Sequence, residues 1–207
     1  MFDYKFDVQI KDKEISCKAF SLEKYIDVLK QSTEGKTSEV FKSLLEEHTN
    51  AKGLTRQESE LLLIKLWAYS LGKVNHEVDY VCECGKTFPV EMNFNHANIQ
   101  GERELVYPLE NFRLVLKYPE IFEDSNVASM VASSIVYIEV ENERIKIDEL
   151  NTHEMDDLYS AITSEDIIKI GELLKEPKVV LAVPVSCSCG KSDIKTITGL
   201  KEFFRII

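Results

Sequence analysis

Two short cysteine pairs are the residues of this chain best able to do chemistry. Both have the pattern Cys-x-Cys-Gly-Lys, at residues 82–86 and 187–191. In a reducing compartment, cysteines paired at short spacing are more often metal ligands or redox groups than disulfides. Tetrahedral zinc takes four sulfur ligands at about 2.3 Å. We therefore predict one structural zinc site, with the ligands Cys82, Cys84, Cys187 and Cys189.

The spacing leaves alternatives open. The usual half of a zinc ribbon is Cys-x-x-Cys-Gly, and both pairs here have one residue fewer, which strains chelation without forbidding it. Free buried thiols are one alternative, and a redox or disulfide role is another. His76 and His96 flank the first pair and are substitute ligands, although an exposed or hydrogen-bonded histidine is the commoner case. Cys17 has no partner nearby and is predicted to be a small buried apolar residue.

The sequence offers little for catalysis. Four thiolates leave zinc no open coordination position, which a catalytic site requires. The His-Glu-x-x-His, Gly-x-Ser-x-Gly and glycine-rich phosphate-binding motifs are all missing. The acids between Asp148 and Asp157 are interpreted as helix caps and a solvated face. We expect a zinc ion that organises the fold, in a protein that is not an enzyme.

Charge and hydropathy disfavour two classes of partner. The chain has 36 acidic and 25 basic residues, for a net charge of −11. This field repels nucleic-acid backbones and anionic membrane surfaces. No apolar run approaches the 18 residues of a membrane span, and acids near the N-terminus argue against a signal peptide. We expect an intracellular protein with reduced cysteines, no nucleic-acid contact and no membrane span.

Hydrophobic periodicity predicts an α+β fold. Residues 3–20 alternate as a β-hairpin, and 21–30 and 39–48 have short helical patterns. The clearest helix is 56–71, with a capping box of Thr55 and Glu58 and with Gly72 as its C-terminal cap. Its apolar residues surround the helix, so we expect it to be central and buried.

The cysteine pairs lie at the tips of two predicted hairpins, whose arms are 76–82 with 87–94 and 178–186 with 192–198. The segment between them has a strand-like run at 112–118, a helical stripe from Val127 to Ile138, a strand or hairpin within 136–147, and helices at 152–162 and 165–175, the last capped by Ser164. The predicted fold is a helical subdomain inserted between the two halves of a zinc-ribbon-like pair of β-hairpins.

The predicted division of the chain has four parts. They are an N-terminal region at 1–54, the central helix and first hairpin at 55–94, a mainly helical insert at 95–177, and the second hairpin with a C-terminal helix at 178–207. Residues 55–207 are expected to form one compact unit.

The C-terminal helix, predicted at 199–206, is a candidate docking element. Two adjacent residues lie about 100° apart around a helix, so Phe203 and Phe204 cannot share one shallow contact. We predict that one ring faces the core and the other faces outward, and that Phe203, Phe204 and Ile207 contact a partner or a second copy of the chain. The alternative is that both rings fold back onto the hairpins.

Several features together resemble the T4-type bacteriophage baseplate protein family. They are the helix from Leu61 to Gly72 that runs into the first Cys-Gly hairpin, a helical middle, the second Cys-Gly hairpin, and the closing Gly199-Leu200-Lys201-Glu202-Phe203-Phe204. Their order covers roughly residues 55–207.

The resemblance implies a structural or assembly role in the central hub of a contractile tail's baseplate. It implies partners among the other hub proteins, with the tape-measure or tail-tube protein as further candidates, and a location in the virion baseplate and in the host cytoplasm during assembly. Two other functions stay open: a zinc-ribbon regulator that binds RNA polymerase or nucleic acid, and a thiol-dependent redox protein or chaperone.

Overall fold

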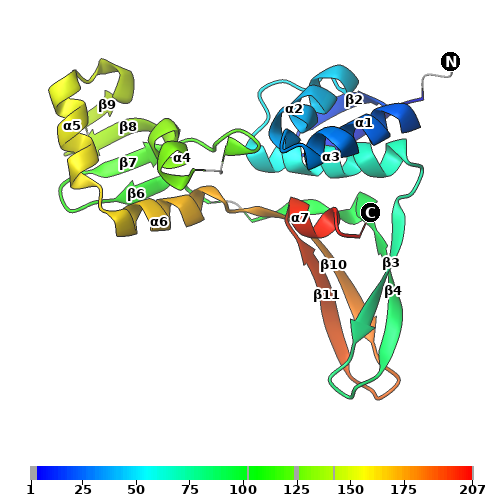
Figure 1. Ribbon diagram of the computed structural model, residues 1–207. Coiled ribbons are helices and arrows are strands. Elements are labelled where there is room, and N and C mark those ends of the chain that lie inside the picture. Colours follow the sequence, from blue (N-terminus) through cyan, green and yellow to red (C-terminus); the bar gives the residue numbers. More distant parts are fainter. Residues whose placement is uncertain (1–3, 102, 124–125, 142, 207) are drawn as a thin grey trace. The chain divides into compact units, whose positions relative to one another are not determined.

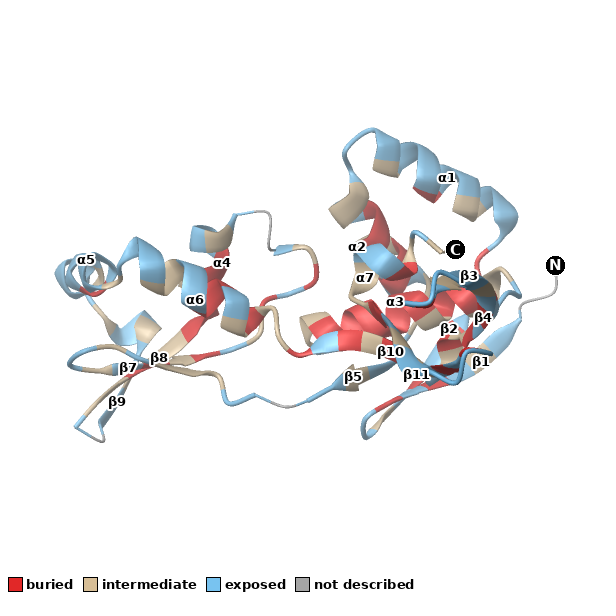
Figure 2. Ribbon diagram, turned by 90° about the horizontal axis from the view of Figure 1, so that it is seen from below, coloured by how far each residue is buried: buried red, intermediate tan, exposed pale blue. Residues whose placement is uncertain are grey.

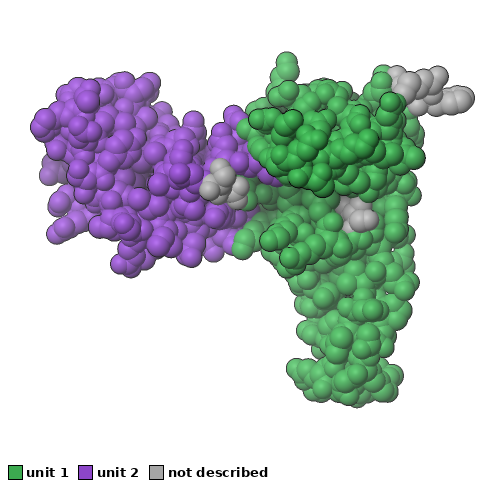
Figure 3. Space-filling view, viewed as in Figure 1, with its two compact units in different colours: residues 1–100, 178–207 green, residues 101–177 purple. Residues whose placement is uncertain are grey.

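The computed structural model describes residues 4–101, 103–123, 126–141 and 143–206. The chain forms two compact units, Met1–Gln100 with Lys178–Ile207 and Gly101–Pro177 (Figure 3). Both units contain helices and small antiparallel sheets, which confirms the α+β class. Among the described helices, none is both long enough and apolar enough to cross a membrane.

The first unit begins with the predicted hairpin, followed by three helices. Its elements are β1 (Lys5–Ile10), β2 (Lys13–Lys18), α1 (Leu22–Thr33), α2 (Thr37–His48) and α3 (Arg56–Ser70). Alternate strand residues such as Val8 and Ile15 face the core, as the period-2 pattern predicts. The capping box at Thr55 and Glu58 is confirmed, as is the left-handed Gly72, whose φ is +64°.

Helix α3 is the centre of the first unit. Leu62, Leu63, Ile64 and Leu66 are completely buried. The Trp67 ring lies 5.3 Å from Phe20, 5.4 Å from Tyr25, 5.7 Å from Phe41 and 5.1 Å from Phe204, measured between ring centroids. A helix whose apolar residues wrap most of the way round it therefore serves as a common packing surface for segments from both ends of the chain.

Two long hairpins project from this core, and Figure 1 shows them side by side with their tips together. The first consists of β3 (Asn75–Val81) and β4 (Thr87–Asn93). The second consists of β10 (Lys178–Ser186) and β11 (Ser192–Thr198), and β10 also pairs with the short strand β5 (Asn98–Gln100). The strands agree with the predicted hairpin arms to within one residue.

Residues 101–177 form a unit with a sheet of its own, which corrects the predicted helical subdomain. Four antiparallel strands lie in the order β6-β7-β8-β9: β6 (Val106–Pro108), β7 (Arg113–Leu116), β8 (Ile135–Val140) and β9 (Glu143–Lys146). The helices are α4 (Val127–Ser134), α5 (Thr152–Ala161) and α6 (Ser164–Leu174). The hairpin predicted within 136–147 is confirmed by the antiparallel pairing of β8 with β9, and Asn142 between them lies outside the described residues.

Two local features explain where the prediction for this unit differs. The helical stripe that begins at Val127 ends at Ser134, because residues 135–140 are rich in β-branched and aromatic side chains, which favour an extended strand. Helix α6 is capped by Thr163 and not by Ser164. Only Thr163 has an acid three residues later, Asp166, which completes a capping box.

The pairing of β5 with β10 explains how the insertion is accommodated. Gln100 lies opposite Lys178, and Ile99 lies opposite Val179. The chain therefore leaves the first unit and returns to it at neighbouring points of one sheet. Because its two connections already lie together, the unit at 101–177 can be inserted without separating the hairpins.

The C-terminal segment packs on the chain's own aromatic residues. Helix α7 (Leu200–Phe203) is shorter than the predicted 199–206, and tighter turns follow it. Phe203 is completely buried with its ring 5.1 Å from that of Phe94. Phe204 is half-buried and stacks on Phe41 at 5.4 Å. The expectation that one of the two rings faces outward is therefore corrected, since both rings contact the core.

We predict that Phe203→Ala lowers the free energy of unfolding of the first unit by about 3–5 kcal/mol, the usual cost of removing a buried aromatic ring. Trp67 is the only tryptophan and lies in α3, so its fluorescence during denaturant titration reports on this unit. Ile194→Ala, at a side chain 61% exposed, is the control and should change stability by less than about 0.5 kcal/mol. Equal effects of the two substitutions would contradict the packing described here.

Candidate metal centre

The two cysteine pairs occupy hairpin loops with the same backbone hydrogen bonds. In the first loop the N–H of Cys82 donates to the carbonyl of Lys86 at 2.9 Å, and the N–H of Gly85 donates to the carbonyl of Cys82 at 2.8 Å. In the second loop the corresponding bonds, from Cys187 and Gly190, are 2.8 and 2.9 Å. The repeated sequence pattern therefore has the same backbone structure in both loops.

This loop geometry explains the short cysteine spacing. Gly85 and Gly190 have φ values of +85° and +90°, in the left-handed region where a side chain would be strained. A four-residue turn that ends in a left-handed glycine is typical of a three-residue hairpin loop. The turn brings the first and third residues of each Cys-x-Cys to the same side, so no second intervening residue is needed.

The four sulfur atoms form a compact cluster. All lie within 4.8 Å of one another, with Sγ–Sγ distances of 3.8 Å for Cys82–Cys189 and 3.7 Å for Cys84–Cys187. Zn–S bonds of about 2.3 Å in a tetrahedron require sulfurs about 3.8 Å apart. A disulfide requires about 2.05 Å, and all five cysteines are free thiols. The cluster therefore fits a tetrahedral metal ion.

The two cysteines of each pair differ in burial, and the first cysteines of the two pairs differ in pKa. Cys82 and Cys187 are buried, whereas Cys84 and Cys189 are exposed. The backbone N–H of Cys189 and hydrogen bonds from the neighbouring thiols lower the pKa of Cys187 to about 6, against the effect of burial. The N–H of Cys84 acts in the same sense on Cys82, but burial and the other three sulfurs outweigh it and raise its pKa to about 12.

These opposite shifts arise from hydrogen bonds within the cluster, because a thiolate at Cys187 accepts from neighbouring thiols that keep their protons. Four thiolates at this distance would repel one another. A divalent cation at the centre would remove that repulsion and hold all four sulfurs as thiolates.

Each loop also reaches across to the other loop through its lysine. Lys86 donates to the hydroxyl of Ser188 at 2.9 Å, and Lys191 forms an ion pair with Glu83. Both acceptors are the middle residue of the opposite Cys-x-Cys. The pKa of Lys191 is raised by Glu83 and then by the cysteine sulfurs. The lysines thus place positive charge beside a site whose four thiolates would leave a net negative charge around a dication.

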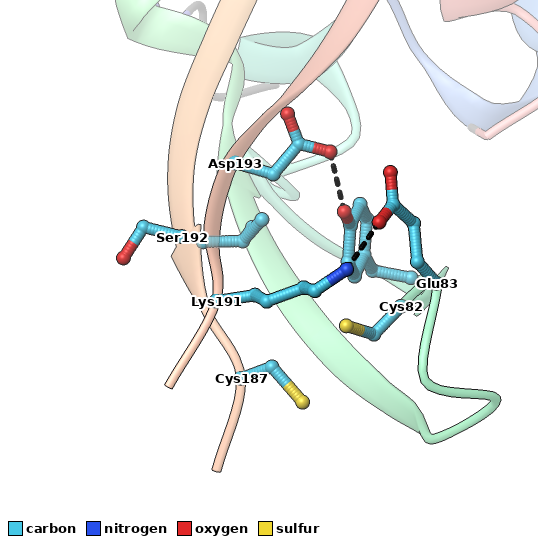
Figure 4. A pocket seen from close by; sticks show the side chains of 8 residues that line it. Cys82, Glu83, Cys187, Lys191, Ser192 and Asp193 are labelled. Carbon is cyan, nitrogen blue, oxygen red and sulfur yellow. Dashed lines mark hydrogen bonds and ion pairs between the residues drawn. The ribbon is translucent and has the colours of Figure 1, made fainter. Parts of the chain in front are cut away.

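A hydrogen bond joins the two hairpins at a point between their tips and their base. The hydroxyl of Tyr80 in β3 donates to the carboxylate of Asp193 in β11 at 2.5 Å, and this bond raises the pKa of Tyr80 to about 12. Both residues line a pocket of about 230 Å³ beside Cys82 and Cys187 (Figure 4). No sequence pattern indicates this contact, because the two residues are 113 positions apart.

Comparisons with known proteins identify the family of this chain. The family model described as T4 bacteriophage base plate protein matches residues 1–205. The baseplate hub assembly protein gp26 of Enterobacteria phage T4 is 45% identical over 208 residues, which cover 100% of both chains. The chain belongs to the T4 bacteriophage base plate protein family. No solved structure matches it.

Membership of the base plate protein family confirms the resemblance drawn from the paired hairpins and the C-terminal segment. The structure adds that these features belong to one unit, in which the C-terminal segment packs beside the hairpins' base.

The other candidate ligands of this family member lie away from the sulfurs. His76 is buried at the opposite end of β3, where its ring stacks on Phe94 at 4.4 Å and Nε2 lies 2.9 Å from the carbonyl oxygen of Lys73. His96 is exposed. Among the described residues, the four cysteines form the one group of histidine, cysteine and acidic side chains close enough to hold a metal ion. Cys17 is buried as predicted, and burial raises the pKa of its thiol to about 12.

The predicted docking residues are not gathered into an open surface. Phe203 and Phe204 contact the core, as described above, and Ile207 lies outside the described residues. A partner contact through the C-terminal segment would therefore involve the half-buried Phe204, or would require this packing to open.

Proposed function

We propose that this protein is a structural or assembly component of the central hub of a contractile-tail baseplate. The observation that carries the proposal is the 45% identity to a hub assembly protein over the whole length of both chains. The partners are then other hub proteins, with the tape-measure or tail-tube protein as further candidates. The protein acts in the host cytoplasm during assembly and at the baseplate of the virion.

We propose further that Cys82, Cys84, Cys187 and Cys189 bind one structural zinc ion and make the paired hairpins a zinc-ribbon-like element. The proposal is supported by sulfur distances near those of a zinc tetrathiolate and by glycines that shape both loops. Since all four positions around the metal would be filled by protein, the ion would bind no substrate. This favours a structural role over catalysis.

Apart from the polar contacts described above and the buried Val185, little apolar packing holds the distal half of the hairpins together. Val81 and Ile194 are 66% and 61% exposed, and Cys84 and Cys189 at the tips are exposed as well. The Lys191–Glu83 pair is solvent-exposed, where ion pairs contribute little. Two narrow hairpins without a core between their tips are not stable on their own. A metal bound to both tips would supply the missing connection.

Two alternatives remain weaker. A zinc-ribbon regulator of RNA polymerase or nucleic acid would have to act against a net charge of −11. A redox protein would use the exposed thiols, but this role would not account for a full-length relationship to a baseplate protein. The family relationship favours the baseplate role over both.

We predict that Cys84→Ser lowers the free energy of unfolding of the first unit by several kcal/mol, because metal binding at such a site is also folding free energy. Cys17→Ser removes a buried thiol outside the site and should cost roughly 1–2 kcal/mol. A strong zinc chelator should lower the melting temperature of the wild type and of Cys17→Ser, and should barely change that of Cys84→Ser. Equal shifts for the two variants, with no chelator effect, would rule out the zinc proposal.

We predict that a stop codon in this gene, in the phage that encodes it, yields particles with normal heads but without complete baseplates. Electron microscopy of the lysate gives the readout. A plasmid copy of the wild-type gene should restore plaques, whereas a copy with a stop codon should not. Normal contractile tails and an unchanged plaque count in the mutant would contradict a role in the baseplate.

A further inference from the structure

Helix α1 carries an apolar stripe that the fold leaves uncovered. Leu22, Ile26 and Leu29 are 69%, 42% and 45% exposed. They are spaced i, i+4 and i+7, so they lie on one face of the helix. Figure 2 shows α1 as largely exposed along its length. Three of the helix's five apolar side chains thus point to solvent. Packing within the first unit does not account for apolar residues at these positions.

The remaining apolar residues of α1 fix the helix to the first unit. Val28 is buried, and the Tyr25 ring lies 5.4 Å from that of Trp67. Lys24 forms an ion pair with Glu47 of α2 at 2.6 Å. The stripe is therefore a second apolar face on a helix that is already docked, and not a core face that has turned outward.

The stripe is flanked by an acidic residue near one end of the helix and a basic residue near the other. Glu23 and Lys30 are seven residues apart, so they lie along the same flank of the stripe, one near each end of the helix. Both are exposed, and neither forms an ion pair with another residue of the described part of the chain. In an antiparallel helix pair, residues on the same flank of the two helices face each other.

We propose that α1 is a homodimerisation surface, in which the stripe pairs antiparallel with the same stripe of a second copy of this chain. A two-fold axis near Ile26 places Leu22 against Leu29 of the partner subunit. It also places Glu23 beside Lys30 of the partner subunit, and the reverse contact follows from the symmetry.

The acid-to-base order is what favours a second copy over an unrelated partner. A parallel arrangement puts the two charged flanks on opposite sides of the seam, so it forms neither ion pair. An antiparallel copy satisfies both apolar and charged positions with no further residue. Since three side chains per subunit bury much less than a standard interface, the dimer should be weak and should exchange rapidly.

Sedimentation velocity of the full-length chain, in the presence of a thiol reductant, tests this assignment over a wide range of protein concentration. The wild type should show a concentration-dependent shift from monomer to dimer. Ile26→Glu should abolish that shift, because it places a charge at the two-fold axis. Ile168→Glu, at an exposed apolar residue 59% exposed on α6, is the matched control and should leave the shift unchanged.

A charge exchange provides the sharper test. Glu23→Lys and Lys30→Glu should each weaken the dimer, because each puts like charges opposite one another. The double variant should restore the wild-type dimer, because it reverses both pairs. A chain that stays monomeric at every concentration, a dimer unaffected by Ile26→Glu, or a double variant as weak as the single ones would overturn the proposal. None of these outcomes bears on the hub role, which is tested separately in the phage.

Discussion

Four sulfur atoms from distant parts of the sequence lie within 4.8 Å of one another at the tips of two hairpins. Four thiolates at this distance would repel one another. The opposite pKa shifts of Cys187 and Cys82 reflect hydrogen bonds within the cluster, in which one sulfur is charged while its neighbours keep their protons. A bound dication would allow all four sulfurs to be thiolates, and the same ion would then hold the two hairpins at one point. Under the zinc proposal, the geometry of the distal half of the first unit depends on this interaction.

In the remainder of the first unit, hydrophobic packing and strand pairing hold together segments that are distant in the sequence. Its chain is interrupted by the unit at 101–177, so the segments before and after the insertion must find each other. They meet at the β5–β10 pairing, at the Phe94–Phe203 contact and around Trp67 of α3. The base of the hairpins is therefore joined by apolar side chains and backbone hydrogen bonds, whereas the tips carry the cluster of four sulfurs. This division explains why the cysteines lie where the hydrophobic core ends.

The sequence predicted the elements of the first unit closely, because each has a strong local signal. The capping box at Thr55, the all-round apolar pattern of α3 and the repeated Cys-x-Cys-Gly-Lys all act over a few residues. It predicted the second unit less well, because a helical stripe from Val127 runs directly into the strand at Ile135 without a turn residue between them. Contacts between distant residues, such as Tyr80 with Asp193, have no local signal and were not found. The outward ring at Phe203–Phe204 was mispredicted because both directions lead to core residues: Phe203 packs on Phe94, and Phe204 packs on Phe41 and Trp67.

Zinc bound by four sulfurs is the central claim, and X-ray absorption at the zinc edge measures it directly on protein purified without chelator. The account predicts about one zinc ion per chain, with four sulfur neighbours at about 2.3 Å and no nitrogen or oxygen neighbour. A folded protein that binds no zinc, or a spectrum that requires nitrogen or oxygen ligands, would contradict it.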